Sequence, residues 1–268
     1  MRVAVYIGKN EADLDCRLTS LLNRLEQGGI QCYMVNSHEE IHENTDMVLS
    51  VGGDGTFLSA SKLVMEHAIP IAGVNMGRLG FLSENRPEDV AEALLTGEYT
   101  VEDRAFLCAN VLGEEQQFYA LNEITVHRSG AAVMGVDVCL DGKWLPTYWA
   151  DGLIVSTSSG STAYSLSVGG PIVMPHSKIL LISPIAPHNL NIRPMVVPNS
   201  VDILLRVQSR DDKFVFTADN VTRELPEETQ IRVSVARFSL KRVRLNKSDF
   251  INALTEKLFW GEDVRNLK

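Results

Sequence analysis

The sequence predicts an α/β domain followed by an all-β domain, and three observations lead to this prediction. Before residue 100, apolar runs of strand length alternate with segments of helical spacing. After residue 100, many short strand-like runs are separated by turn residues, and the last segment is helical again. We therefore expect a Rossmann-like, mostly parallel sheet with helices over residues 1–100, an antiparallel β-sandwich over 101–245, and a C-terminal helix at 246–268 that docks back on the first domain.

The first hundred residues alternate strand and helix in order. Gly28 and Gly29 suit the end of the first helix, and Pro87 suits the first turn of the third. In a parallel sheet of this kind, ligands bind beyond the carboxyl ends of the strands. The apolar patterns predict strands at 3–7, 31–35, 47–51 and 70–75 and helices at 11–27, 56–67 and 87–96.

The second half of the sequence has the residue pattern of short strands joined by turns. Asp141-Gly142 lies between two apolar runs and is a strong two-residue hairpin signal. After the strands, helical spacing resumes at 248–259, with Ser248 as a candidate cap and an apolar face that needs a partner. The predicted strands are 106–112, 118–127, 134–140, 143–149, 152–157, 179–183, 201–207, 214–218, 231–235 and 243–245.

Composition limits the classes of function. The 268 residues are 45% hydrophobic and 22% charged, with a formal net charge of −9, which argues against a broad nucleic-acid footprint or a polybasic membrane surface. The four cysteines are dispersed, and no apolar run approaches the roughly 20 residues that span a bilayer. We expect a cytoplasmic protein that acts on small molecules and binds neither nucleic acid nor membrane.

A glycine-rich turn, Gly52-Gly-Asp-Gly-Thr56, separates a predicted buried strand from a predicted helix. Glycines let the backbone approach a bound group, and the free N–H groups that open a helix suit phosphate. Asp54 is an anion where an anionic ligand is expected. The turn is therefore either an ordinary capped helix start, with Asp54 as the cap, or a site where Asp54 takes part in chemistry.

Two further stretches are unusual for a β-sandwich. Eight of the twelve residues from Ser156 to Ser167 are serine or threonine, which is typical of a flexible linker or of a binding loop that opens a helix. The helical spacing of Ala163 and Leu166 favours the binding loop. Asn122 and Glu123 lie side by side on an apolar strand, so at least one faces burial unless Asn122 starts a bulge and Glu123 faces solvent.

Together these stretches resemble the NAD kinase family along nearly the whole chain. The matching segments are Gly52 to Thr56, Asn122-Glu123, Asp151-Gly152 and Ser158-Ser-Gly-Ser-Thr-Ala-Tyr164, and Asn75-Met-Gly-Arg-Leu-Gly-Phe-Leu82 is similar too. The first segment alone is shared with diacylglycerol and sphingosine kinases and, in variant form, with phosphofructokinases. The ordered combination is much more specific. No dinucleotide-binding Gly-x-Gly-x-x-Gly, P-loop or hydrolase elbow is present.

The resemblance implies transfer of the γ-phosphoryl group of ATP to the 2′-hydroxyl of the adenosine ribose of NAD, giving NADP and ADP and regulating the NAD/NADP balance. Asp54 would be the general base or orienting group, Mg²⁺ would accompany ATP without an assigned protein ligand, and the chain would form a homodimer or homotetramer. The implied substrate contacts are Gly52, Gly53, Asp54, Gly55, Thr56, Phe81, Asn122, Glu123, Asp151, Ser159, Thr162, Ala163, Tyr164, Ser165, Leu166, Ser167, Ala186 and Asn220.

The chain departs from the family pattern at Trp149, two positions before Asp151, where the family often has a basic residue. Asn220 lies in a less uniform motif. A lipid or sugar kinase of the same superfamily and a non-catalytic NAD(P) sensor remain alternatives, and acceptance of NADH or of polyphosphate is left open.

Overall fold

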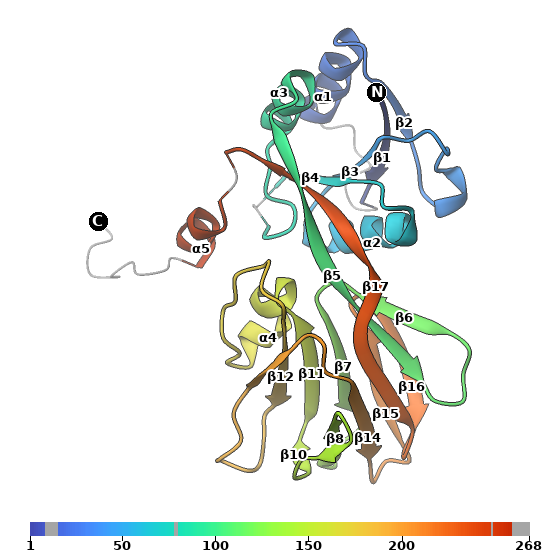
Figure 1. Cartoon of the computed structure of the whole chain (residues 1–268), viewed down its shortest axis with the longest axis vertical. Coiled ribbons are helices and arrows are strands. Elements are labelled where there is room, and N and C mark those ends of the chain that lie inside the picture. The colour runs from blue at the N-terminus through green and yellow to red at the C-terminus, as the bar shows by residue number, and fades with distance from the viewer. Residues whose placement is uncertain (9–15, 78–79, 248, 259–268) are drawn as a thin grey trace. The chain divides into compact units, whose positions relative to one another are not determined.

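The computed structural model describes residues 1–8, 16–77, 80–247 and 249–258, which form two compact units (Figure 1). Unit 1 comprises Met1–Asp103 and the residues from Leu240 onward, and unit 2 comprises Arg104–Ser239. The fold is a mixed α/β sheet with helices, an antiparallel β-sandwich and a C-terminal helix, so the predicted fold class is confirmed.

Unit 1 is built on parallel strands in the order β17-β4-β3-β1-β2. The first four along the chain are β1 (Arg2–Ile7), β2 (Gln31–Met34), β3 (Met47–Val51) and β4 (Ile71–Val74). All residues of β3 and β4 are buried, because helices cover both faces of the sheet. The carboxyl ends of these two strands lead into residues 52–55 and 75–80, at the edge where ligands bind in sheets of this kind.

The helices of unit 1 cover two faces. Apolar residues of α1 (Cys16–Gln27) and α3 (Pro87–Thr96) share one core cluster with the strands, whereas α2 (Asp54–Val64) lies on the other face (Figure 1). The C-terminal helix α5 (Phe250–Leu258) belongs to unit 1, where the ring centroids of Phe250 and Phe81 are 6.2 Å apart. The predicted cap Ser248 and residues 11–15 of the first predicted helix lie outside the described residues.

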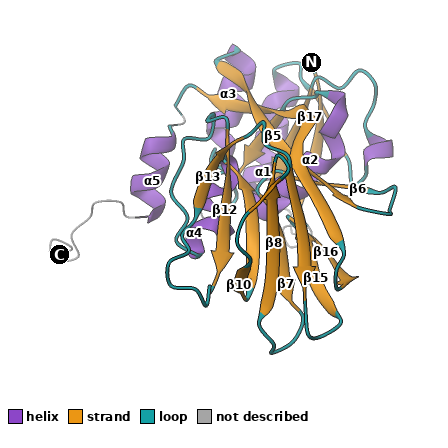
Figure 2. Cartoon of the chain, turned by 60° about the horizontal axis from the view of Figure 1, so that its bottom comes forward, coloured by secondary structure: helices purple, strands orange, loops and turns teal. Residues whose placement is uncertain are grey.

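Unit 2 consists mainly of strands, drawn orange in Figure 2. Its six-stranded antiparallel sheet has the order β13-β12-β11-β7-β15-β16 and packs an apolar core together with β8, β14 and the first part of β17. Its elements are β6 (Gln117–Ala120), β7 (Glu123–Arg128), β8 (Met134–Leu140), β9 (Lys143–Trp144), β10 (Tyr148–Ala150), β11 (Gly152–Thr157), α4 (Tyr164–Ser167), β12 (Ile179–Ile185), β13 (Met195–Pro198), β14 (Ile203–Gln208), β15 (Lys213–Ala218) and β16 (Val221–Pro226).

Two long strands differ from the sequence prediction. The predicted strands 231–235 and 243–245 are parts of one strand, β17 (Gln230–Leu245), and β5 (Tyr99–Val111) begins seven residues before the predicted start at 106. Both strands carry charged residues between their apolar segments, so alternation alone does not connect the segments. Each strand runs across the sequence boundary between the two units.

Candidate active site

The glycine-rich turn of unit 1 joins β3 directly to α2. Gly52 has φ of +145°, a region that L side chains rarely adopt, and its N–H donates to the carbonyl of Val74 at 2.8 Å. Gly53 is the N-cap residue, so α2 begins at Asp54, two residues before the predicted start at Thr56. No side chain in the described part of the chain caps the helix, so its first N–H groups are available to an anion.

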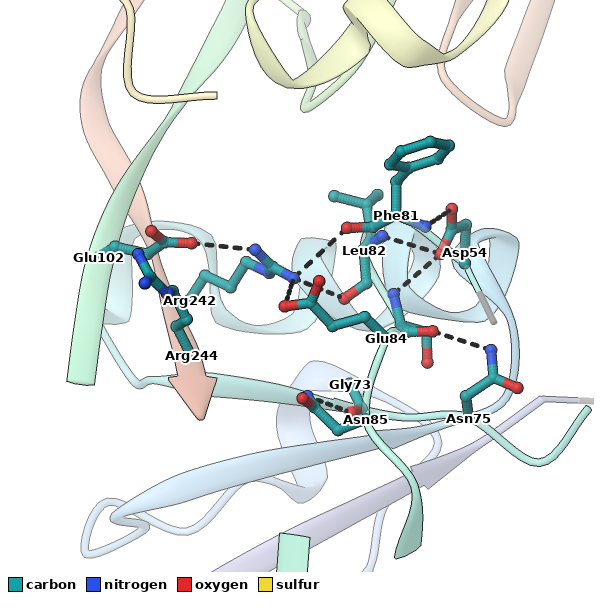
Figure 3. Close-up of polar contacts among 12 residues, drawn as sticks. Asp54, Gly73, Asn75, Phe81, Leu82, Glu84, Asn85, Glu102, Arg242 and Arg244 are labelled. Carbon is teal, nitrogen blue, oxygen red and sulfur yellow. Dashed lines mark hydrogen bonds and ion pairs between the residues drawn. The ribbon is translucent and has the colours of Figure 1, made fainter. Parts of the chain in front are cut away.

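Asp54 does not act as the helix cap. Its carboxylate instead accepts hydrogen bonds from the backbone N–H groups of a loop 27 to 29 residues further along the chain (Figure 3). Oδ2 accepts from Phe81 at 2.8 Å, and Oδ1 accepts from Leu82 at 3.0 Å and from Ser83 at 2.8 Å. Three charge-assisted hydrogen bonds fix the orientation of this carboxylate, so the capped-turn alternative is wrong.

The loop of residues 80–84, called here the acid-binding loop, is itself held to the sheet. The hydroxyl of Ser83 donates to the carbonyl of Gly52 at 2.5 Å, and the side-chain amide of Asn75 donates to the carbonyl of Ser83 at 2.8 Å. A Cβ at Gly80 would overlap the Asp54 carboxylate. The acid-binding loop therefore approaches Asp54 so closely that only glycine fits at its first position.

Two cations from the end of the chain also contact the acid-binding loop. Arg242 of β17 pairs with Glu84 at 2.7 Å, and only 5% of its side chain is exposed. Lys257 of α5 donates to the carbonyl of Gly80, and its ammonium nitrogen lies 4.5 Å from the centroid of the Phe81 ring. Burial lowers the pKa of Lys257, against the opposing effect of Glu84 and Asp54.

In unit 2, Asn122 lies in the break between β6 and β7, and Glu123 is the first residue of β7. The predicted strand 118–127 is interrupted because the carboxylate of Asp219 accepts hydrogen bonds from three successive backbone N–H groups, those of Leu121 at 2.7 Å, Asn122 at 3.0 Å and Glu123 at 3.1 Å. These N–H groups therefore bind a side chain and not the backbone of a neighbouring strand.

Burial distinguishes the two side chains of this break from ordinary surface residues. Among the described residues, Asn122 Oδ1 and Glu123 Oε2 are buried acceptors with no hydrogen-bond partner. Glu123 is thus not the solvent-facing residue that the bulge alternative expects. Burial first, and then the nearby Asp219 carboxylate, raise the pKa of Glu123 to about 7, against a small lowering by the backbone N–H of Tyr164.

The serine- and threonine-rich stretch is an ordered part of unit 2 and not a linker. The serines and the threonine from Ser156 to Ser161 are at most 8% exposed. The segment contacts the backbone at Asn122. Thr157 donates its N–H to the carbonyl of Asn122 at 2.9 Å and its hydroxyl to the carbonyl of Leu121 at 2.6 Å. A Cβ at Gly160 would overlap the Asn122 backbone, which explains a glycine at that position.

Tyr164 lies among charged and aromatic groups of unit 2. Its ring stacks on that of His127, with centroids 5.6 Å apart and an interplanar angle of 11°. Burial, Glu123 and Asp151 all raise the pKa of Tyr164, and burial lowers that of His127. Asp151 pairs with Arg128 at 3.1 Å, so a cation does stand beside Asp151 although Trp149 replaces the basic residue expected nearby.

The remaining predicted contact residues differ in their exposure to solvent. Ser165 is fully buried, and its hydroxyl lies 3.0 Å from that of Ser183, so it faces the protein interior. Ala186 is exposed directly after β12, with φ of +44°. In unit 2, Ser159 is buried, Thr162, Ala163 and Leu166 are partly buried, and Ser167 and Asn220 are exposed; in unit 1, Gly55 is exposed and Thr56 is partly buried.

Sequence reasoning missed three residues that shape these sites. Asp219 precedes the predicted Asn220 in a two-residue turn between β15 and β16, and its φ of +51° is typical of Asp in such turns. The Asp-Asn turn between two apolar runs was the sequence signal from which Asp219 could have been found. Arg242 and Glu84 gave none, because their pairing depends on β17 lying beside β4, where Arg242 is opposite Ile71.

Comparisons with known proteins agree for both halves of the chain. Residues 10–99 match the model of the ATP-NAD kinase N-terminal domain, and residues 121–245 match that of the C-terminal domain. The chain is 41% identical over 239 residues to the NAD kinase of Flavobacterium psychrophilum, covering 86% of this chain and 81% of the relative.

Solved structures are similar as well. Yeast NADH kinase complexed with NADH aligns with a TM-score of 0.85 and 25% identity, covering 99% of this chain and 90% of that one. An NAD kinase from Archaeoglobus fulgidus in complex with ATP aligns with a TM-score of 0.80 and 28% identity, covering 97% of this chain and 99% of that one.

The fold, the matched families and the named relatives define a kinase, a phosphotransferase with an alcohol group as acceptor. The chain belongs to the NAD kinase family, and its activity is that of an NAD⁺ kinase. None of the described helices is long and apolar enough to cross a membrane.

Proposed function

We propose that this chain transfers the γ-phosphoryl group of ATP to the 2′-hydroxyl of the adenosine ribose of NAD, giving NADP and ADP. This reaction would regulate the balance of NAD and NADP in the cell. The observation that carries the proposal is the placement of Asp54, a carboxylate held in one orientation at the glycine-rich start of α2.

Asp54 is proposed to orient the acceptor hydroxyl and to take its proton. A carboxylate has about four lone-pair sites, and the described residues use three of them, two on Oδ1 and one on Oδ2. The remaining site on Oδ2 is where the ribose hydroxyl would donate. Because phosphoryl transfer passes through a loose transition state, proton removal comes late, and a weak base contributes mainly by positioning.

Unit 1 is proposed to bind phosphate, through the N–H groups of Gly53, Gly55 and Thr56 at the helix start, with Phe81 alongside. Unit 2 is proposed to bind NAD. The buried acceptors Asn122 Oδ1 and Glu123 Oε2 suit the hydroxyl donors of a ribose, which would remove the cost of leaving them unpaired. The other NAD contacts proposed from the resemblance are Asp151, Ser159, Thr162, Ala163, Tyr164, Ser165, Leu166, Ser167, Ala186 and Asn220, and burial makes Ser165 the weakest of them.

A divalent cation, with Mg²⁺ expected, is proposed to arrive with ATP. No group of three or more His, Cys, Asp or Glu side chains that could hold a metal ion occurs within the described ranges. Mg²⁺ usually keeps several waters and binds through nucleotide phosphates, so it needs no protein cage of that kind. When bound, it would neutralise charge on the transferred phosphoryl group.

The proposal is tested by incubating the purified protein with ATP, Mg²⁺ and NAD, and detecting NADP with an NADP-specific dehydrogenase. Asp54→Asn should lower kcat by about two to four orders of magnitude, with NAD still bound. Near-normal turnover of that variant would remove Asp54 from the mechanism.

Parallel reactions test the substrates. NADH replaces NAD in one, polyphosphate replaces ATP in another, and lipid or sugar acceptors replace NAD in a third. Absence of NADP with turnover of a lipid or sugar would overturn the choice of acceptor. The homodimer or homotetramer and the cytoplasmic location remain predictions, tested by light scattering and by fractionation.

A further inference from the structure

Arg242 lies on β17, where its backbone is paired with Ile71 of β4 in unit 1. Only 5% of its side chain is exposed, and a buried guanidinium needs several partners because an uncompensated buried charge is strongly destabilising. Its two terminal nitrogens point in different directions. Nη1 donates to Glu102 of β5 at 2.9 Å, whereas Nη2 faces the acid-binding loop.

Nη2 contacts the acid-binding loop on its carbonyl side. It donates to Glu84 at 2.7 Å and lies 3.3 Å and 3.4 Å from the carbonyl oxygens of Leu82 and Phe81 (Figure 3). Asp54 binds the same segment from its N–H side. The loop is therefore held between a cation and an anion.

Two peptide groups connect these charges directly. The carbonyl of Phe81 and the N–H of Leu82 belong to one peptide group, with its oxygen toward Arg242 and its N–H toward Asp54. The carbonyl of Leu82 and the N–H of Ser83 form a second group with the same orientation. Hydrogen bonds arranged in such a chain polarise one another, so the guanidinium strengthens the N–H donors that fix the carboxylate.

We propose that Arg242 is a positioning residue for the phosphoryl-transfer reaction, which acts on Asp54 through the peptide groups of residues 81–83. The inference rests on the proposed role of Asp54. Arg242 contacts neither substrate in this scheme. Its effect is to hold the N–H donors of Leu82 and Ser83, and with them the Asp54 carboxylate, in the orientation that the acceptor hydroxyl requires.

The variant that tests this is Arg242→Lys. Lysine keeps the positive charge, which limits the loss of stability, but its single ammonium cannot contact Glu102, Glu84 and two carbonyls with the geometry of a guanidinium fork. We expect kcat to fall by about tenfold to a hundredfold, since small misplacements of reacting groups have effects of this size. KM for NAD and for ATP should change by less than about threefold, because the substrate contacts are intact.

A matched control separates positioning from a general loss of stability. Arg206 of unit 2 also uses two nitrogens in an ion pair, with Asp137 at 3.0 Å from Nε and 2.7 Å from Nη2, although 46% of its side chain is exposed. Arg206→Lys should leave kcat within about twofold of the parent, because its loss affects only local stability. Equal loss of kcat in the two variants would overturn the proposal.

A double-mutant cycle asks whether Arg242 acts through Asp54. In the Asp54→Asn background, adding Arg242→Lys should reduce the residual kcat by less than about threefold, since residues that act as a unit are not additive. Loss of the same full factor in both backgrounds would show that Arg242 acts independently of Asp54, which would refute the positioning role.

Amide hydrogen exchange provides a readout without catalysis. Amides in peptides covering residues 80–85 should exchange at least about tenfold faster in Arg242→Lys than in the parent. Their exchange rate should not change in Arg206→Lys. Faster exchange in Arg242→Lys, found together with a wild-type protein that makes no NADP, would overturn the proposed reaction and keep the loop contact. Unchanged exchange with normal wild-type activity would overturn the inference alone.

Discussion

The raised pKa of Glu123 makes a quantitative prediction about Glu123→Gln. The carboxyl group titrates near pH 7 in the folded chain, against an ordinary value of 4.5. Below pH 4.5 it is protonated in both folded and unfolded chains. As the pH rises toward 7, the unfolded chain loses this proton first, so the native state of the wild type loses stability until the folded group has also ionised.

The size of this effect follows from the shift. One pKa unit corresponds to about 1.4 kcal/mol, so a shift from 4.5 to about 7 amounts to roughly 3 kcal/mol at most. Glutamine cannot ionise and has nearly the same shape. Glu123→Gln should therefore exceed the wild type in free energy of unfolding by up to about 3 kcal/mol at pH 8, and the two should be nearly equal at pH 4.5.

The assay is urea unfolding of the nucleotide-free protein, followed by circular dichroism between pH 4.5 and 8. Glu114→Gln serves as the control, because Glu114 makes an accessible ion pair with Arg223 and its loss should change stability by less than about 1 kcal/mol, with no gain at high pH. A Glu123→Gln protein that is no more stable at pH 8, or whose gain does not vary with pH, would refute the reasoning. The same variant should raise KM for NAD if the proposed ribose contact exists.

Three other variants test the surroundings of the two sites. Asp219→Asn removes the charge that helps to raise the folded-state pKa of Glu123, so the stability gain from adding Glu123→Gln should stop growing at a lower pH and should be smaller at pH 8, measured by the same unfolding series; an unchanged gain would leave burial as the sole cause. Gly80→Ala places a Cβ where the Asp54 carboxylate lies, and kcat should fall at least about tenfold with an unchanged circular dichroism spectrum; full activity would show that the loop can move aside. Gly160→Ala drives a Cβ into a neighbouring backbone and should destabilise the protein by about 1–3 kcal/mol and raise KM for NAD, whereas wild-type stability would contradict the tight fit.

The fold class could be predicted from the sequence because the pattern changes near residue 100 from alternating strands and helices to short strands. The family could be predicted from the motifs. The sequence located the glycine-rich turn and the Asn122-Glu123 pair, since short local patterns carry both. It did not predict what Asp54 and Asp219 bind. Each carboxylate holds backbone groups that are distant in sequence, 27 to 29 residues away for Asp54 and 96 to 98 for Asp219, and such partners leave no periodic trace.

The errors in strand limits have the same origin. The prediction placed Glu123 within an uninterrupted strand because its neighbours are apolar, whereas three hydrogen bonds to Asp219 end β6 and start β7 on either side of residues 121–122. Tertiary contacts of this kind override local preference. The burial that leaves the Glu123 oxygen without a partner likewise depends on the surrounding sandwich, which alternation of residues cannot describe.

The pairing of Arg242 with Glu84 has a consequence for synthesis of the chain. The two residues are 158 positions apart, with all of unit 2 encoded between them. At roughly 5–20 residues per second, the ribosome adds the arginine on the order of ten to thirty seconds after the glutamate. During that interval the nascent first hundred residues lack β17 at the edge of β4 and the cation that holds the acid-binding loop. A chaperone that binds the exposed edge of β4 would therefore have a defined period in which to act, ending when β17 arrives.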